Sequence, residues 1–135
     1  MPDATPGPTP DEESASFWHA LREHRVELQR CVACGRHRFP PMPSCPWCAS
    51  TSQAVVESAG EGTVYSWVTV HRAFDAAWAD QVPYTIAVVE LRERCRLLGR
   101  VETDPGGLEA GLEVAPRFVD HTDWTELRFA PREMT

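Results

Sequence analysis

Two Cys-x-x-Cys pairs constrain the fold of this chain more than any other feature of its sequence. They read CVAC at residues 31–34 and CPWC at residues 45–48, with ten residues between them. Each pair places two thiolates on one tight turn, and two such turns supply the four sulfurs of a tetrahedral Zn²⁺ site. Gly35 follows the first pair directly, where a turn of this kind needs a positive φ angle. We therefore predict one metal site with the ligands Cys31, Cys34, Cys45 and Cys48.

Zinc in a structural site is the cofactor we expect, because four protein ligands close its coordination sphere and leave no open position for catalysis. A single iron or an iron–sulfur cluster also accepts four thiolates. A redox-active pair would not explain two pairs in tandem. His37 lies near the cluster, but with four cysteines present we do not expect it to be a ligand. A unit of about forty residues buries too little core to fold alone, and metal binding can hold it folded.

Composition and charge restrict the class of protein further. The 135 residues carry a net charge of −7, and all 13 basic residues are arginine. An acidic chain is a poor candidate for non-specific nucleic-acid binding, which usually rests on a basic face. No apolar run approaches the ~18 residues that span a bilayer, so we expect no membrane protein. The acidic, proline-rich start does not resemble a signal peptide, so we expect a cytoplasmic location. In that compartment, an odd count of five cysteines argues against a disulfide framework.

We divide the chain into three parts. Residues 1–13 are rich in proline and acids and are expected to form a disordered tail. Residues 14–50 are expected to hold a helix and the metal-binding ribbon. Ser14 or Ser16 can cap a helix that begins near Phe17 and stops near His24 or Arg25, and a short strand then leads into Cys31. A further short strand is expected at residues 38–39.

Residues 51–135 read as short strands separated by turn residues. Strands are expected at 54–58, 63–70, 84–91, 96–102, 113–119 and 125–129. Gly60-Glu61-Gly62 interrupts the first two of these runs, which predicts one bent or bulged strand and therefore five strands in all. A short helical turn is expected near residues 108–110. Five strands in some 80 residues suit a small closed Greek-key barrel of the OB type.

The connection from His71 to Pro83 is long for a compact domain, and long connections are often functional. An arginine beside an aromatic ring can clamp a phosphate and stack on a base, so Arg72 and Phe74 are candidate ligand-binding residues. The alternatives are an anchor on a neighbouring subunit, or Phe74 and Trp78 packed under the loop as a minor core. His71 with Asp75 would suit acid–base chemistry, but no third group is placed to complete a catalytic set.

Cys95 is the cysteine that the metal site leaves over. It lies between Arg94 and Arg96, which would favour its thiolate if the site is exposed. No acid–base partner flanks it in the sequence, so a nucleophilic role stands against the alternative of a half-buried thiol at a strand end.

The order of these features resembles the DUF35 family, the zinc-ribbon proteins with an OB-fold. The resemblance rests on LQRCVACGRHRFPPMPSCPWC, on GEGTVYSWVTVHRAF, and on VPYTIAVVEL followed by RLLGRV. It implies a mainly β chain with an N-terminal helix, a rubredoxin-like zinc ribbon and a five-stranded OB-fold barrel. It also implies an accessory subunit that docks on a thiolase-fold enzyme and helps to bind or pass acyl-CoA. That enzyme would be a ketothiolase or a lipid-transfer-type aldolase, with or without a MaoC-like hydratase.

Three function hypotheses follow. The first is the non-catalytic accessory subunit, for which Arg72 and Phe74 are the candidates for CoA contacts. The second is single-stranded nucleic-acid binding, because OB-folds bind single strands through a positive groove and stacking aromatics; the net charge weighs against it. The third is an enzyme that uses Cys95 or His71, around which nothing in the sequence assembles. We predict the first.

Overall fold

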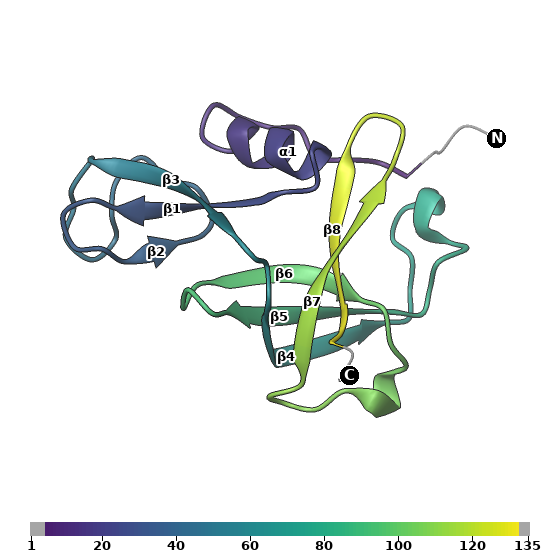
Figure 1. The fold of residues 1–135 in the computed structure, drawn as a ribbon. Helices are drawn as coiled ribbons and strands as arrows, with labels where there is room; N and C mark the ends of the chain where they lie inside the picture. Colours follow the sequence, from purple (N-terminus) through teal and green to yellow (C-terminus); the bar gives the residue numbers. More distant parts are fainter. Residues whose placement is uncertain (1–4, 133–135) are drawn as a thin grey trace.

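The computed structural model describes residues 5–132, and it consists mainly of β-strands with one short helix (Figure 1). The helix is followed by a three-stranded sheet and then by a closed five-stranded barrel, which confirms the predicted fold class. In chain order the elements are α1 (Ala15–Arg22), β1 (Val26–Cys31), β2 (His37–Arg38), β3 (Gln53–Ser58), β4 (Gly62–Val70), η1 (Ala76–Trp78), β5 (Tyr84–Leu91), β6 (Arg96–Val101), η2 (Pro105–Gly107), β7 (Glu113–Asp120) and β8 (Thr125–Pro131).

The first sheet carries the cysteine segment, and its strands pair antiparallel in the order β2-β1-β3. β3 covers the strand predicted at 54–58, which we expected to continue into the barrel. It pairs instead with β1 along its whole length, from Val26↔Ser58 to Cys31↔Gln53. The chain leaves this sheet at Gly60, whose φ is 72° and where a Cβ would lie 2.9 Å from a Pro116 side-chain carbon. Glycine is required there by both conformation and space, so the expected bent strand is two strands in two sheets.

The barrel closes in the order β4-β5-β6-β8-β7, with one parallel pair, β6 and β8. Side chains of β5 alternate between the interior and the outside, because successive residues of a strand point to opposite faces. Gly99 of β6 faces the interior, where the fully buried Phe129 fills the barrel. A Cβ on Gly99 would lie 2.7 Å from a ring carbon of Phe129. The absence of a side chain at Gly99 therefore makes room for this ring.

α1 begins at Ala15, two residues before the predicted start, and it buries Phe17 and Leu21. Ser14 does not cap the helix through its side chain. Its N–H instead donates to the Asp11 carboxylate at 2.8 Å, while its hydroxyl accepts from the Asp11 N–H at 3.1 Å. The chain turns away from the helix axis at His24, which adopts a φ of 60°. The buried face of the helix belongs to one core cluster with β1 and the barrel, so ribbon and barrel share a core.

The end of α1 is fastened to the turn between β7 and β8, which lies above the barrel (Figure 1). The Arg22 guanidinium donates to the carbonyl oxygens of His121 at 2.8 Å, Thr122 at 3.0 Å and Trp124 at 3.0 Å. His24 adds an interaction with the Asp120 carboxylate at 3.0 Å. These contacts join residues about 100 positions apart and fix the helix on the barrel.

The N-terminal segment lies against Trp124 of the barrel over the part that the structure describes. The Trp124 indole N–H donates to the carbonyl of Thr5 at 3.3 Å, and a Cβ on Gly7 would lie 2.6 Å from the indole ring. We expected residues 1–13 to be a disordered tail; residues 1–4 of that prediction lie outside the described residues. No helix within residues 5–132 is long and apolar enough to cross a membrane.

Candidate metal centre and exposed apolar surfaces

The two cysteine pairs form two turns of the same design. In the first, the Gly35 N–H donates to the Cys31 carbonyl at 2.8 Å; in the second, the Ala49 N–H donates to the Cys45 carbonyl at 2.9 Å. The residue after each pair has a positive φ, 79° at Gly35 and 65° at Ala49. The sequence predicted this conformation at Gly35 and missed it at Ala49, because alanine gives no signal for it.

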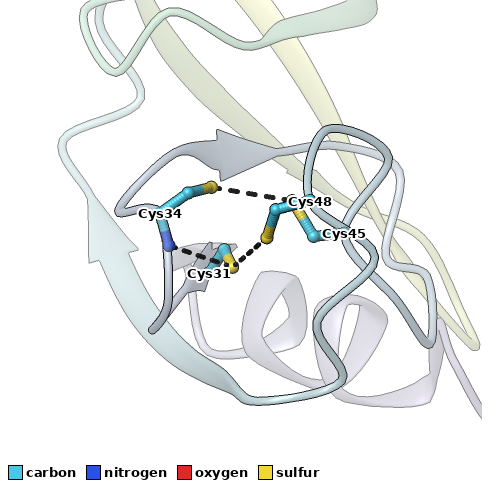
Figure 2. A group of neighbouring side chains, drawn as sticks. All are labelled: Cys31, Cys34, Cys45 and Cys48. Carbon is cyan, nitrogen blue, oxygen red and sulfur yellow. Dashed lines mark hydrogen bonds between the residues drawn. The ribbon is translucent and has the colours of Figure 1, made fainter.

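The four sulfurs face one another between the two turns (Figure 2). The Sγ atoms of Cys31 and Cys48 are 3.6 Å apart, those of Cys34 and Cys45 are 3.7 Å apart, and all four lie within 4.8 Å of one another. A tetrahedron with Zn–S bonds of 2.3 Å has sulfur–sulfur edges of about 3.8 Å. All five cysteines are free of disulfide bonds. The four residues therefore fit one tetrahedral metal ion, and the group brings together all four predicted ligands.

The backbone of the first cysteine turn favours the thiolate of Cys31. The Cys34 N–H points at the Cys31 sulfur at 3.5 Å, and this hydrogen bond, with smaller contributions from the neighbouring thiols of Cys48 and Cys34, lowers the pKa of the Cys31 thiol to about 6. A lowered thiol pKa favours metal binding, because the thiolate is the form that ligates a metal. Cys31 and Cys45 are buried while Cys34 and Cys48 are exposed, so the site lies at the surface of the ribbon. His37, half-buried on β2, is not part of the four-sulfur group.

The surroundings of Cys95 do not favour a nucleophilic role. It is 7% exposed in the turn between β5 and β6 and belongs to the apolar core. Burial, with a smaller contribution from the charge of Glu93, raises the pKa of its thiol to about 11. A thiol with that pKa stays protonated at neutral pH and is a weak nucleophile. Of the two alternatives for Cys95, the structure favours the structural thiol.

The loop of residues 71–83 brings Arg72 and Phe74 together at the surface. The Arg72 guanidinium lies 5.3 Å from the centre of the Phe74 ring, and Phe74 is 88% exposed. Phe74 is therefore not packed under the loop. The Asp75 carboxylate accepts from the Ala77 N–H at 2.8 Å and caps the short helical turn η1. Asp75 thus has a structural role that does not involve His71.

Sequence reasoning missed an apolar surface on the outside of the barrel. Strands β4, β5 and β6 lie side by side there, and register places Val68 beside Ile86 and Val88 beside Leu98. Val68 and Leu98 are 63% and 68% exposed. We call this surface the apolar face; its residues are Tyr65, Val68, Ile86, Val88 and Leu98. The run at 84–91 contained the signal, because it is apolar on both sides of the strand over Ile86–Val89, and a strand of that kind is covered on both sides.

The apolar face continues into a groove between the barrel, the helix and the ribbon. The groove has a volume of about 640 Å³. We call it the aromatic groove after its rings, which are Phe17, Trp18, Phe39, Trp78, Tyr84 and Trp124. Two arginines border it. Arg96 stacks on Tyr65 at 3.7 Å and Arg100 lies over Tyr84 at 5.1 Å.

The fold and the four-sulfur site define a zinc-ribbon protein with a C-terminal OB-fold. Residues 18–52 match the family model described as "ChsH2, rubredoxin-like zinc ribbon domain", and residues 55–119 match "ChsH2, C-terminal OB-fold domain". A DUF35 domain-containing scaffold protein of Methanocaldococcus jannaschii is 35% identical over 80% of this chain and 78% of its own length. The chain belongs to the DUF35 family.

Two further relatives are larger. The 3-oxo-4,17-pregnadiene-20-carboxyl-CoA hydratase alpha subunit of Mycobacterium tuberculosis is 36% identical over 98% of this chain. A probable enoyl-CoA hydratase alpha subunit of Thermomonospora curvata is 37% identical over 90% of this chain. The matched segments are 42% and 36% of those two proteins, so this chain corresponds to less than half of each.

Solved structures share the fold. A chain of the Ltp2-ChsH2(DUF35) aldolase superimposes with a TM-score of 0.82 at 34% identity, over 93% of this chain and 98% of that one. A DUF35-family protein of Sulfolobus solfataricus has a TM-score of 0.66 at 19% identity, over 90% of this chain and 86% of that one. The second likeness concerns the fold alone.

Proposed function

We propose that this chain is a non-catalytic subunit that docks on an acyl-CoA-processing enzyme of thiolase fold. The partner would be a ketothiolase or a lipid-transfer-type aldolase, with or without a MaoC-like hydratase. The observation that carries the proposal is the apolar face. Val68 of β4 and Leu98 of β6 lie on either side of β5, and side chains as exposed as these on one face of a sheet mark a surface that a partner covers.

The chemistry of the described residues agrees with a supporting role. The metal ion would have four protein ligands and no open position for substrate. Cys95 is buried, and the Asp75 carboxylate caps the short helical turn η1. Arg96 and Arg100 border the apolar surface, and arginine and aromatic side chains are enriched where proteins bind one another. A partner with apolar residues flanked by carboxylates would fit this surface.

The relatives support the same conclusion by their names. One similar chain comes from a structure named as an aldolase of two components, Ltp2 and ChsH2. Others are named scaffold proteins or hydratase alpha subunits that act on CoA thioesters. These names favour a chain that works in a hetero-oligomer with enzymes of acyl-CoA metabolism.

Within this function we propose Arg72 and Phe74 as CoA contacts. The guanidinium would hold a phosphate while the exposed ring stacks on the adenine. Arg72→Ala is expected to weaken acyl-CoA binding to the assembled complex about tenfold, the loss typical of a charged hydrogen bond. Arg92→Ala is the matched control, because Arg92 is an exposed arginine that pairs with Glu61. Equal affinity of the two variants would remove Arg72 from the proposal.

The docking itself is tested by co-expression with the enzymes encoded beside this chain, among which the proposal expects one of thiolase fold. The complex is expected to survive gel filtration, and Leu98→Asp is expected to abolish it. Val55→Asp is the control, because Val55 is 55% exposed on β3 of the ribbon, outside the apolar face. A complex that tolerates Leu98→Asp as well as Val55→Asp would contradict docking through the apolar face. No complex, together with tight single-stranded DNA binding at moderate salt, would favour the nucleic-acid hypothesis.

A further inference from the structure

Arg38 of β2 is a buried cation whose hydrogen-bond partners are all neutral. It is the largest of the fully buried side chains among the described residues, with an exposure of 2%. Its Nε donates to the Gln29 side-chain oxygen at 2.9 Å, and its Nη2 donates to the Met42 carbonyl at 3.2 Å and to the Gln53 side-chain oxygen. A buried charge is costly unless an opposite charge accompanies it.

No carboxylate supplies that opposite charge within residues 5–132. Glu27 is the acid of β1 on the same side of the sheet, two residues before Gln29. It already accepts from the Ser16 hydroxyl at 2.7 Å and pairs with Arg25 at 3.2 Å. The ion pairs found among the described residues involve cations other than Arg38.

Strand register brings the guanidinium to the metal centre. Arg38 pairs with Gln29, and Cys31 lies two residues further along β1, so the three side chains project from the same face of the sheet. Gln53 of β3 lies directly opposite Cys31. Because the guanidinium reaches across β1 to bond the Gln53 side chain, its charge lies over the face of β1 from which the Cys31 side chain projects.

Four thiolates around a divalent ion carry a net charge of −2. We propose that Arg38 is the buried counter-charge of this metal–tetrathiolate centre, and that it sets the affinity for the metal without ligating it. The cation stabilises the four thiolates in the loaded state, and the metal–thiolate cluster offsets the cost of burying the guanidinium. Groups around the ligands commonly control metal affinity in this manner.

A purely mechanical role is the alternative. The Gln29 side-chain oxygen accepts from the Met42 N–H at 2.9 Å as well as from Arg38. Arg38 and Gln29 therefore also hold the proline-rich return between the two cysteine turns. The two roles differ in what they require of residue 38. A counter-charge requires a cation, whereas the mechanical role requires the hydrogen bonds.

The test compares Arg38→Met, Arg38→Lys and Gln29→Leu in the full chain. Arg30→Met is the control, since Arg30 is exposed on the opposite face of β1 and its loss changes the net charge equally. Zn²⁺ affinity is measured by competition with a chromophoric chelator. The thiolate-to-metal charge-transfer band of the Co²⁺-loaded protein verifies that four sulfurs still coordinate.

We expect Arg38→Met to lower Zn²⁺ affinity about 10- to 100-fold, in the range found for groups that support metal ligands. Arg38→Lys, Gln29→Leu and Arg30→Met are each expected to stay much closer to the parent protein. Unchanged affinity of Arg38→Met would overturn the proposal, as would an equal loss in Arg38→Met and Arg30→Met. If Arg38→Met does not fold, Arg38→Lys and Gln29→Leu distinguish the two roles. Metal affinity retained by both of these variants supports the counter-charge. A 10-fold or greater loss in both would assign Arg38 to the mechanical role.

Discussion

Gly35 and Ala49 occupy equivalent positions in the two cysteine turns, and both have left-handed backbone conformations, with φ angles of 79° and 65°. Each residue donates its N–H to the carbonyl of the first cysteine of its pair. Glycine adopts this conformation without strain, whereas alanine meets a steric cost of about 1–2 kcal/mol. The second turn is therefore strained where the first is not.

The strain predicts opposite effects for two exchanges. Ala49→Gly is expected to raise the free energy of unfolding by about 0.5–1 kcal/mol, because the strain it relieves exceeds the added freedom of the unfolded chain. Gly35→Ala is expected to lower it by a similar amount. A Cβ at Gly35 would meet no atom within 4 Å, so that loss would come from the backbone alone. Urea unfolding of the zinc-loaded protein measures both, and a destabilised Ala49→Gly would contradict the strain argument.

The cysteine spacing carried most of what could be predicted about the ribbon. The four ligands are local in sequence, so their pattern alone brings them to one point. The pairing of β3 with β1 is different, because it joins Gln53 to Cys31 across the whole metal-binding segment. Nothing in the alternation of residues 53–58 states which strand they will pair with.

The second prediction concerns metal removal. The ribbon sheet has a two-residue strand on one side, and its cysteine turns contribute little apolar core. Structural zinc contributes roughly 10–16 kcal/mol to such small units. A strong chelator is therefore expected to unfold the ribbon, seen as loss of protected amides in β1–β3 by hydrogen exchange. Cys45→Ser is expected to behave like the chelated protein.

Matched controls separate metal loss from the loss of one thiol. Cys95→Ser removes a thiol outside the metal site, so it is expected to keep the full metal content and the protection of β1–β3. Metal content by elemental analysis should be one ion per chain in the parent and in Cys95→Ser. A folded ribbon in metal-free Cys45→Ser would contradict a structural role for the metal.

The third prediction follows from the burial of Cys95, which raises the pKa of its thiol from 9.0 to about 11. At pH 8 the thiolate fraction is then about 100-fold lower than that of an unperturbed cysteine. In the zinc-loaded protein we expect iodoacetamide to modify Cys95 at least 100-fold more slowly than after unfolding in urea. Peptide mass spectrometry at timed intervals measures the rate. Modification of the folded protein at the unfolded rate would show that the thiol is accessible and ionised.

The same shift has a consequence for stability at high pH. The folded state holds the Cys95 proton up to about pH 11, whereas the unfolded chain releases it near pH 9. The protonated thiol therefore stabilises the fold below pH 9, and this contribution is lost as the pH rises from 9 towards 11. Cys95→Ala is expected to lose less stability than the parent over that range. Parallel declines of the two proteins in urea unfolding at pH 9 and pH 10.5 would contradict this.

The apolar surfaces could be predicted only in part. The run at 84–91 showed that β5 is apolar on both sides, since Ile86 and Val88 alternate with Ala87 and Val89. The aromatic groove could not be predicted from a local pattern, because it forms where Phe17 of the helix meets residues of the barrel about 80 positions later. That meeting depends on Arg22 fastening the helix to the turn at residues 121–124, a long-range contact that no local pattern encodes.

The fourth prediction concerns the barrel interior, where Gly99 gives space to Phe129. A Cβ at position 99 would lie 2.7 Å from one ring carbon and 3.2 Å from the carbonyl oxygen of Leu127. Phe129 is fully buried, and close packing of a protein interior leaves little room for a ring to shift. Overpacking of this kind typically costs about 1–3 kcal/mol, so Gly99→Ala is expected to lower the free energy of unfolding by that amount. Gly106→Ala is the matched control, because a Cβ there would have no neighbour within 4 Å. Equal stability of the two variants in urea would mean that the barrel can expand around the ring.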